Sequence, residues 1–338
     1  MKYCMLLWPH ANVRYQDASL QLARSELRLM LDVFAPEATV RADDSRNLPT
    51  LLIETPDAMS RELTDALRRH SLMYALFEVC EGGLLRPTAT RFSAYVGADL
   101  PGVLKYKGKT NELFLQLLIN VALMAGGFAH KGGEALSLLD PMCGRATSLF
   151  AAANYGWNTA GTDVDKGDLA EAERFLKRYF EFHRMKYTSE RHSRTIAGSA
   201  KNAPCCEFTF ADTPQRFKSG DTRDLQLVLT DASNARAAFG REKFHMIVCD
   251  LPYGVQHAGV GGGVETLLRK SLPTWRETLK KGGTVALSFN AQTLKRDAVR
   301  SMLADAGFEV KTGGAYDEFA HWVEQAVTRD IAVARRTN

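Results

Sequence analysis

Four acidic residues stand where four apolar, strand-like stretches of the sequence end. They are Asp140, Asp163, Asp231 and Asp250. In a doubly wound sheet the carboxyl ends of the parallel strands lie along one edge, and ligands bind in the crevice outside that edge. Carboxylates gathered there accept hydrogen bonds from hydroxyl and amino groups. The pattern therefore predicts a site for a ligand that carries a sugar and a base.

The first of these strand ends is also a glycine turn. Residues 140–144 read Asp-Pro-Met-Cys-Gly and lead directly into a helix pattern. A glycine at such a turn lets the backbone approach a ligand closely, and the helix end offers free N–H groups. A nicotinamide dinucleotide site needs the pattern GxGxxG, whereas Ala146 and Leu149 stand where the second and third glycines would be. This difference disfavours a dehydrogenase.

The other three strand ends are weaker when each is taken alone. Asp163 lies 23 residues after Asp140, the usual distance for a carboxylate that binds a ribose diol, although a helix cap is an alternative. Asp231 could accept a hydrogen bond from an adenine amino group. Asp250 opens the segment Asp-Leu-Pro-Tyr-Gly, which could be only a tight turn after a buried strand. Their joint occurrence favours one shared site.

The elements that must position these residues alternate between strand and helix patterns. Such alternation predicts a largely parallel sheet with helices on both faces. The expected strands are residues 136–139, 159–163, 225–229, 244–249, 284–289, 308–310 and 327–333. Residues 205–210 are expected to add a strand whose role the sequence does not indicate.

The first part of the chain has a different pattern. Residues 1–82 alternate as βαββαβ, the order of a ferredoxin-like unit. Glycines and prolines punctuate residues 83–104, which are therefore expected to be a linker, and residues 105–338 form the second domain. A small α+β appendage without a ligand of its own is an equally good interpretation of the first unit.

The segments 140–144, 161–163 (Gly-Thr-Asp) and 250–254 resemble those of class I S-adenosylmethionine-dependent methyltransferases. Within that class they are similar to the RNA methylase group typified by tRNA guanosine-2-N-methyltransferases, which are often attached to THUMP domains. The resemblance covers residues 105–338. It implies a Rossmann-like α/β fold with a mostly parallel seven-stranded sheet, an S-adenosylmethionine cofactor, and RNA, in particular tRNA, as the partner.

The resemblance also implies roles for individual residues at the cofactor. The ribose would be held by Asp163 beside Val164, and the adenine by Asp231 beside Ala232. The methionine end of the cofactor would be lined by Asp140, Pro141, Met142, Cys143 and Gly144. No metal site is expected, because the six cysteines contain no CxxC pair.

The tetrad Asp250, Leu251, Pro252 and Tyr253 would match the [DN]-P-P-[YFW] motif of amino-group methylases. An exocyclic amine is a poor nucleophile because its lone pair is delocalised into the ring. The Asp250 carboxylate and the Leu251 carbonyl can each accept an N–H, which fixes the amine and stabilises positive charge as the methyl group arrives. Tyr253 would stack on the ring.

Three departures from the family pattern stand out. Ala146 replaces the second glycine of the turn, and its methyl group is tolerable only if that residue keeps a negative φ. Leu251 replaces the first proline of the tetrad, which loosens the turn. Residues 83–104 are too few for a full THUMP domain, so RNA capture by that module is not implied.

Basic residues offer a substitute for such a module. Residues 174–201 contain eight Lys and Arg but only two Glu, and aromatic residues are interleaved with them. A track that binds phosphates and stacks bases requires this combination. A solvated helix face is an equally good interpretation. The candidate RNA-binding residues are Lys105, Lys107, Lys109, Arg178, Arg184, Lys186, Arg191 and Arg194.

The composition limits the remaining classes. No apolar run is long enough to span a membrane and no secretory signal is evident, so a cytoplasmic protein is expected. The sequence thus predicts an N-methyltransferase acting on guanosine N2 in tRNA. An adenine-N6 methylase of RNA or DNA and a protein glutamine methylase use the same tetrad and remain open. So does a catalytically silent module that binds the cofactor or RNA, which Ala146 and Leu251 would favour.

Overall fold

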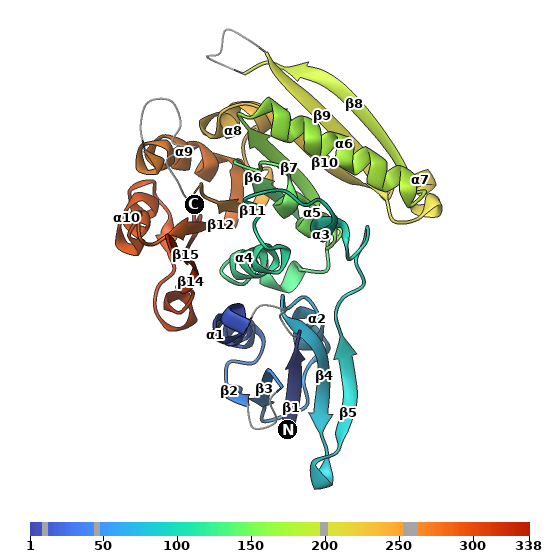
Figure 1. The fold of residues 1–338 in the computed structure, drawn as a ribbon, viewed down its shortest axis with the longest axis vertical. Coiled ribbons are helices and arrows are strands. Elements are labelled where there is room, and N and C mark those ends of the chain that lie inside the picture. Colours follow the sequence, from blue (N-terminus) through green and yellow to red (C-terminus); the bar gives the residue numbers. More distant parts are fainter. Residues whose placement is uncertain (9–12, 44–47, 197–201, 253–262) are drawn as a thin grey trace.

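A computed structural model of residues 1–338 describes the whole chain except residues 9–12, 44–47, 197–201 and 253–262 (Figure 1). Two sheets are present in the described part, one of five strands and one of ten. No helix in that part is long and apolar enough to cross a bilayer.

The smaller sheet is antiparallel and has the strand order β2-β3-β1-β4-β5. The first six helices and strands of this part of the chain follow the predicted βαββαβ order. The fifth strand was not predicted, because it lies in the segment expected to be a linker. The elements are β1 (Lys2–Leu7), α1 (Val13–Phe34), β2 (Thr39–Asp43), β3 (Thr50–Glu54), α2 (Arg61–Leu67), β4 (Met73–Val79), β5 (Leu85–Thr90) and the short helix α3 (Leu100–Val103).

The larger sheet contains all seven strands that were predicted for it, in the order β10-β7-β6-β11-β12-β15-β13. These strands are β6 (Ser137–Asp140), β7 (Asn158–Asp163), β10 (Arg223–Leu229), β11 (Phe244–Asp250), β12 (Leu279–Asn290), β13 (Glu309–Val310) and β15 (Val327–Arg335). The expectation of a mostly parallel, seven-stranded sheet is nevertheless wrong. Strand β15 pairs antiparallel with both β12 and β13, which makes the sheet mixed. Three further strands, β8 (Lys186–Arg194), β9 (Ala203–Ala211) and β14 (His321–Glu324), also pair antiparallel with their neighbours.

Helices cover both faces of this sheet, which explains why its central strands are apolar without alternation. In β11, Met246 and Val248 pack on one face, whereas Ile247 and Cys249 pack on the other. Residues on both faces of such a strand are therefore buried, as Met246 to Cys249 are. The helices are α4 (Glu112–Met124), α5 (Thr147–Ala153), α6 (Lys166–Phe182), α7 (Pro214–Ser219), α8 (Ala235–Phe239), α9 (Val264–Thr278) and α10 (Arg296–Asp305).

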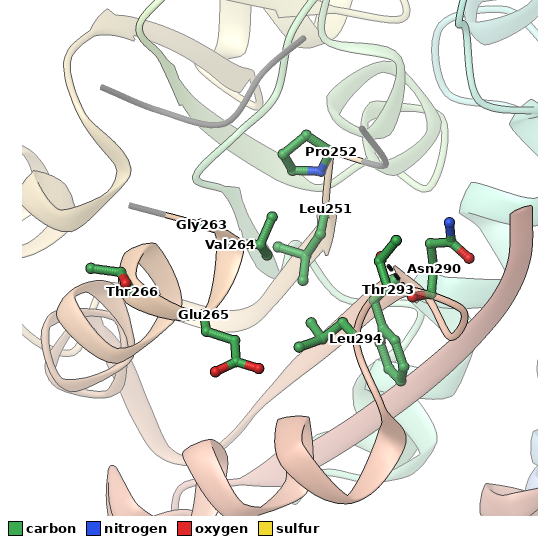
Figure 2. Close-up of a pocket in the computed structure, with 10 residues that line it drawn as sticks. Leu251, Pro252, Gly263, Val264, Glu265, Thr266, Asn290, Thr293 and Leu294 are labelled. Atoms are coloured by element: carbon green, nitrogen blue, oxygen red, sulfur yellow. Dashed lines mark hydrogen bonds between the residues drawn. The ribbon is translucent and has the colours of Figure 1, made fainter. Parts of the chain in front are cut away.

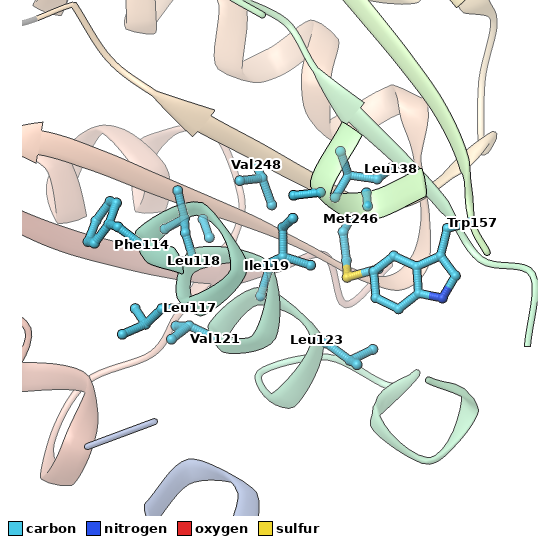
Figure 3. Close-up of a cluster of buried hydrophobic side chains, with 14 of the residues drawn as sticks. Phe114, Leu117, Leu118, Ile119, Val121, Leu123, Leu138, Trp157, Met246 and Val248 are labelled. Carbon is cyan, nitrogen blue, oxygen red and sulfur yellow. The ribbon is translucent and has the colours of Figure 1, made fainter. Parts of the chain in front are cut away.

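Helix α4 is the apolar element that joins the two parts of the molecule. It packs between α1 and the large sheet, and its residues 114–124 are all buried (Figure 1). Figure 3 shows Leu118 and Ile119 on the side that faces Val248 and Met246 of β11. A helix covered on both sides has no polar stripe to expose.

A buried polar network also joins the two parts. The Asn120 amide on α4 donates to Glu26 Oε1 and to the Arg69 carbonyl, both at 2.7 Å, and Ser71 N donates to the same Glu26 oxygen at 3.0 Å. Glu26 is only 1% exposed. Because breaking one member of such a network leaves a buried group without its partner, the two parts are held in a defined relation.

The basic residues after β7 do not all lie on one helix, as the interpretation of a solvated helix face would require. Helix α6 ends at Phe182, Arg184 takes a positive φ of 53°, and the chain returns as β8, which pairs with β9. Strand β9 contains the predicted strand at residues 205–210. The two strands extend the sheet beyond β10 as an antiparallel hairpin at its edge (Figure 1).

Candidate active site

The turn between β6 and α5 is held by its own side chains and backbone. Asp140 is 4% exposed, accepts the Ser148 hydroxyl, and accepts Met142 N at 3.0 Å. Burial raises the pKa of Asp140 to about 7. A carboxyl group in this state is expected to bind a cationic ligand well, because a nearby positive charge offsets the cost of ionising it.

Asp163 lies at the end of β7 and faces this turn. Its Oδ2 accepts Gly144 N at 2.7 Å, and its Oδ1 accepts Asp165 N at 2.9 Å. Burial raises the pKa of Asp163. Asp165, rather than Asp163, caps helix α6 by accepting Gly167 N and Asp168 N. The helix-cap alternative for Asp163 is therefore wrong, and each of its oxygens keeps a lone pair for a further donor.

Two small residues allow this turn to lie close to β7. A Cβ at Gly161 would meet Cys143 Sγ at 2.6 Å and Leu149 Cδ1 at 2.8 Å, so no larger residue fits there. Ala146 has a φ of +66°, contrary to the negative φ that its methyl group was expected to require. This left-handed conformation costs an alanine roughly 1–2 kcal/mol. Its methyl group is fully buried in the core, which offsets part of that cost.

Asp231 lies at the end of β10 and caps the short turn that follows it. Its Oδ1 accepts Ser233 N at 2.9 Å and the Ser233 hydroxyl, and lies 3.7 Å from Lys270 Nζ. Partial burial opposes ionisation, but these hydrogen bonds outweigh it and lower the pKa of Asp231. Ala232 is buried and its carbonyl accepts Trp275 Nε1 at 2.9 Å. Val164, by contrast, is 71% exposed.

Asp250 ends β11 and is held by two residues that are distant in sequence. Its Oδ2 accepts the Thr110 hydroxyl and lies 3.8 Å from Arg329 Nη2. Leu251 follows it, buried, with its N–H donated to the Ser288 carbonyl at 2.9 Å. Pro252 is half-buried, and Tyr253 lies outside the described residues.

The thiols beside these carboxylates are not nucleophiles. Cys249 is fully buried, and Cys143 is 6% exposed. Burial raises the pKa of both thiols well above their usual range. The interpretation of Cys249 as a buried strand residue is confirmed.

The segment that enters α4 contributes residues that sequence reasoning missed. The Tyr106 hydroxyl lies 3.1 Å from Thr147 Oγ1, and the Arg145 guanidinium lies 4.7 Å from the centre of the Tyr106 ring. Thr110, four residues later, reaches Asp250. One short stretch thus contacts both the glycine turn and the fourth strand end. The only local signal for Tyr106 and Thr110 was that they are adjacent in sequence to the three predicted lysines.

A cavity of about 390 Å³ opens beside Leu251 and Pro252 (Figure 2). Its wall is apolar where Leu251, Val264 and Leu294 line it, and Glu265 adds a carboxylate. Residues 140–144 are not among the described residues that line it. The cavity therefore lies on the Asp250 side of the site and is separate from the glycine turn.

The predicted RNA-binding residues fall into three groups. Lys105 and Lys107 are exposed on either side of Tyr106. Arg178, Arg184 and Lys186 are also exposed, and no ion pair involves them within the described residues, but they lie near the far end of α6. That helix has 17 residues and starts at the site edge of the sheet. At about 1.5 Å per residue it carries Arg178 about 18 Å from its start, and Arg184 and Lys186 about 25 Å.

The remaining three cations have partners within the protein, although Arg191 is itself exposed. Arg191 binds Glu173 with two nitrogens, and Arg194 binds Glu207 at 2.6 Å and the Ala238 carbonyl at 2.7 Å. Lys109 donates to the Pro101 carbonyl at 2.6 Å, and burial lowers the pKa of Lys109. These three side chains are paired within the protein, and their assignment to RNA binding stays a prediction.

A doubly wound sheet with a glycine turn after its first parallel strand and an acidic residue after the second is typical of nucleotide-binding α/β domains, to which class I methyltransferases belong. The sequence profile of the UPF0020 family, described as an RMKL-like methyltransferase domain, matches residues 131–317. Because this match spans more than half of the 338 residues, the chain belongs to that family. The protein is a methyltransferase whose cofactor is S-adenosylmethionine.

Several solved methyltransferase structures are similar to this chain at low sequence identity. The magnesium protoporphyrin IX methyltransferase of Synechocystis PCC 6803 with bound S-adenosylmethionine is 15% identical over 71% of this chain and 90% of that chain, with a TM-score of 0.39. A ribosomal protein L11 methylase from Lactobacillus delbrueckii subsp. bulgaricus is 12% identical over 68% and 81%, with a TM-score of 0.38.

A third structure is the W203A mutant of the 16S rRNA (adenine(1408)-N(1))-methyltransferase from Catenulisporales acidiphilia. It is 15% identical over 68% of this chain and 93% of that chain, with a TM-score of 0.34. No curated protein matches the sequence.

Proposed function

We propose that this protein methylates an exocyclic amine of RNA, namely guanosine N2 in tRNA. The observation that carries the proposal is the pair Thr110 and Asp250. Thr110 holds one oxygen of the carboxylate, next to the Leu251 carbonyl and a cavity, on the sheet edge that also carries Asp140 and Asp163. A carboxylate and a carbonyl side by side suit an amine that must be oriented rather than deprotonated beforehand.

The cofactor supplies an electrophilic methyl group on a positively charged sulfur. The residues present fit it. Asp140 is a buried carboxyl group whose raised pKa a cation would offset, and residues 140–144 would line the methionine end. Asp163 has lone pairs left for the two ribose hydroxyls, with Val164 exposed beside it. Asp231 and Ala232 would face the adenine.

The acceptor amine would be held by two oxygens. One N–H would bind the Asp250 carboxylate and the other the Leu251 carbonyl, which directs the nitrogen lone pair toward the methyl group. Both oxygens also stabilise the positive charge that develops on nitrogen. Alignment of this kind contributes on the order of 7–11 kcal/mol to a transfer between two bound groups. Pro252 and Tyr253 would lie against the ring of the acceptor base.

RNA would approach across the segment 105–110. Lys105 and Lys107 are exposed on that segment, whose other residues contact both the turn and Asp250. A base inside a duplex could not enter such a site, so the target nucleotide would have to leave its stack at a cost of a few kcal/mol. Arg178, Arg184 and Lys186 would contact a more distant part of a large RNA such as tRNA.

We infer the domain organisation on the same basis. Residues 105–338 would be the catalytic domain of a cytoplasmic enzyme. Residues 1–82 would be a ferredoxin-like unit, because strands β2, β3, β1 and β4 have the sheet order and antiparallel pairing of that fold. Strand β5 would extend that unit into residues 83–90.

Methyl transfer onto bulk tRNA tests the proposal. The purified protein is incubated with tRNA and isotopically labelled S-adenosylmethionine, and the digested nucleosides are separated. We expect label in N2-methylguanosine. Recovery of label in N6-methyladenosine or in protein glutamine would reject guanosine N2, and cofactor binding without transfer to any of these acceptors would favour a silent binding module.

A further inference from the structure

A second group of ligand-type side chains lies away from the active site, on the hairpin of β8 and β9. His192 on β8 is directly opposite Cys205 on β9, and Glu207 is two residues further along β9. Residues at such positions share one face of a sheet, with opposed Cβ atoms about 5 Å apart. The backbone ladder thus brings an imidazole, a thiol and a carboxylate together.

The distances within this group suit a tetrahedral metal ion. His192 Nε2 lies 3.4 Å from Glu207 Oε1, and Cys205 Sγ lies 3.7 Å from the same oxygen. Zinc bonds of usual length at tetrahedral angles place nitrogen and oxygen ligands roughly 3.3 Å apart, and sulfur and oxygen ligands roughly 3.6 Å apart. All three ligand atoms lie within 4.8 Å of one another, so a small rotation of the exposed His192 ring would close the third distance.

The surroundings also resemble those of a metal ligand set. Cys205 is 4% exposed and packs with Ile196, Val228 and Ala238. Glu207 accepts Arg194, whose guanidinium also donates to the Ala238 carbonyl and to Gln226. Carboxylates that bind metals are commonly held by such an outer partner. Arg194 donates to the same Oε1 that lies near His192 and Cys205. Because each carboxylate oxygen has two lone pairs, Oε1 can accept Arg194 with one and bind an ion with the other.

We propose that His192, Cys205 and Glu207 bind a Zn²⁺ ion, with water in the fourth position. A thiolate and a carboxylate would neutralise the ion, and the mixed sulfur, nitrogen and oxygen donors favour zinc over magnesium or calcium. The ion would link the outermost strand β8 to β9 at this edge of the sheet. The sequence could not indicate this site, because His192 lies 13 residues before Cys205 and 15 before Glu207, and no CxxC pair is present.

Zinc titration of the full chain tests the site. The protein is stripped with a chelator and titrated with Zn²⁺ against a chromogenic competitor, with Mg²⁺ as a second probe. We expect one tightly bound zinc ion per chain and no competition by Mg²⁺. His192→Ala and Cys205→Ser should each weaken zinc binding by more than the roughly 10- to 100-fold that loss of an outer partner costs.

Cys206→Ser is the matched control. Cys206 is adjacent in sequence, but its side chain packs in the core cluster on the opposite face of β9, so zinc binding should be unchanged. His192 is exposed and its replacement does not endanger the fold. The proposal is overturned if the folded wild-type protein binds no zinc, or if His192→Ala and Cys205→Ser bind it as tightly as Cys206→Ser does.

Discussion

The glycine turn after β6 and the carboxylate at the end of β11 lie on the same edge of one sheet, yet they are built differently. The turn is held by residues close to it in sequence. Asp140 binds Ser148 and Met142, and Asp163, at the end of the next strand, binds Gly144. Asp250 is held by Thr110 and Arg329, from segments 140 and 79 residues away.

This difference separates binding from catalysis. A turn that satisfies its own polar groups is formed before the cofactor arrives, so its residues should determine cofactor affinity. A carboxylate fixed by distant segments depends on how the whole domain is assembled, so its partners should determine the rate of transfer. The two sets of residues should therefore respond differently to substitution.

The largest effect is expected for Asp140 in the turn, whose replacement should change the free energy of unfolding of the protein at high pH. The folded-state pKa of Asp140, about 7, lies above the ordinary value of 3.8, so folding favours the protonated form. The stabilisation of the folded state by the protonated Asp140 carboxyl is complete below about pH 4 and is lost as the pH rises through 7. Three pKa units correspond to about 4 kcal/mol. Asp140→Asn should thus stabilise the cofactor-free protein by up to this amount at pH 8.

The same substitution should have little effect at pH 4, where both side chains are neutral. Urea unfolding at the two pH values measures the difference. An equal change in unfolding free energy at pH 4 and pH 8 would show that Asp140 is ionised in the folded protein throughout.

The next effect concerns the Asp250 side of the comparison. Asp250→Ala should lower kcat by about 100-fold, because one of two groups that stabilise the transition state is lost. Asp250→Asn keeps an oxygen that can accept the amine N–H and should recover much of the rate. Steady-state methyl transfer onto tRNA measures both variants. An alanine variant with unchanged turnover would remove Asp250 from its proposed role.

Gly161→Ala tests the turn by crowding it. A new methyl group would meet Cys143 Sγ and Leu149, and overpacking of this kind costs about 1–3 kcal/mol of stability. The displaced turn should also bind S-adenosylhomocysteine more weakly. Gly133→Ala is the control, since a Cβ there meets nothing within 4 Å. Equal affinities for the two variants in calorimetry would mean that the turn does not contact the cofactor.

Thr110→Val should give the smallest effect. Loss of the hydroxyl leaves Asp250 without one hydrogen bond, and a bond to a charged group contributes about 1.5 kcal/mol, or roughly tenfold in kcat. The affinity for S-adenosylhomocysteine should not change, because Thr110 acts as a positioning residue for Asp250. Thr110→Ser keeps the hydroxyl and should restore kcat. A variant that instead lost cofactor affinity would place Thr110 with the turn.

The same difference explains what the sequence could predict. Strands β6, β7, β10 and β11 and the acidic residues at their ends follow from apolar runs and local turn chemistry. Thr110, Arg329 and Tyr106 carry no local signal, since their roles arise only when distant segments meet. Strand β8 was missed because its basic residues continue the polar pattern of α6, and only pairing with β9 decides that they form a strand.

The most direct test is a crystal structure of the protein with S-adenosylhomocysteine. If the turn and Asp250 serve one reaction, the ribose hydroxyls lie on Asp163, and the sulfur lies within roughly 8 Å of the Asp250 carboxylate. That separation is the sum of a hydrogen bond to the amine, a near-attack approach of its nitrogen to the methyl carbon, and the methyl–sulfur bond of the reacting cofactor. An adenosyl group bound in the cavity beside Leu251, or a sulfur directed away from Asp250, would contradict the account.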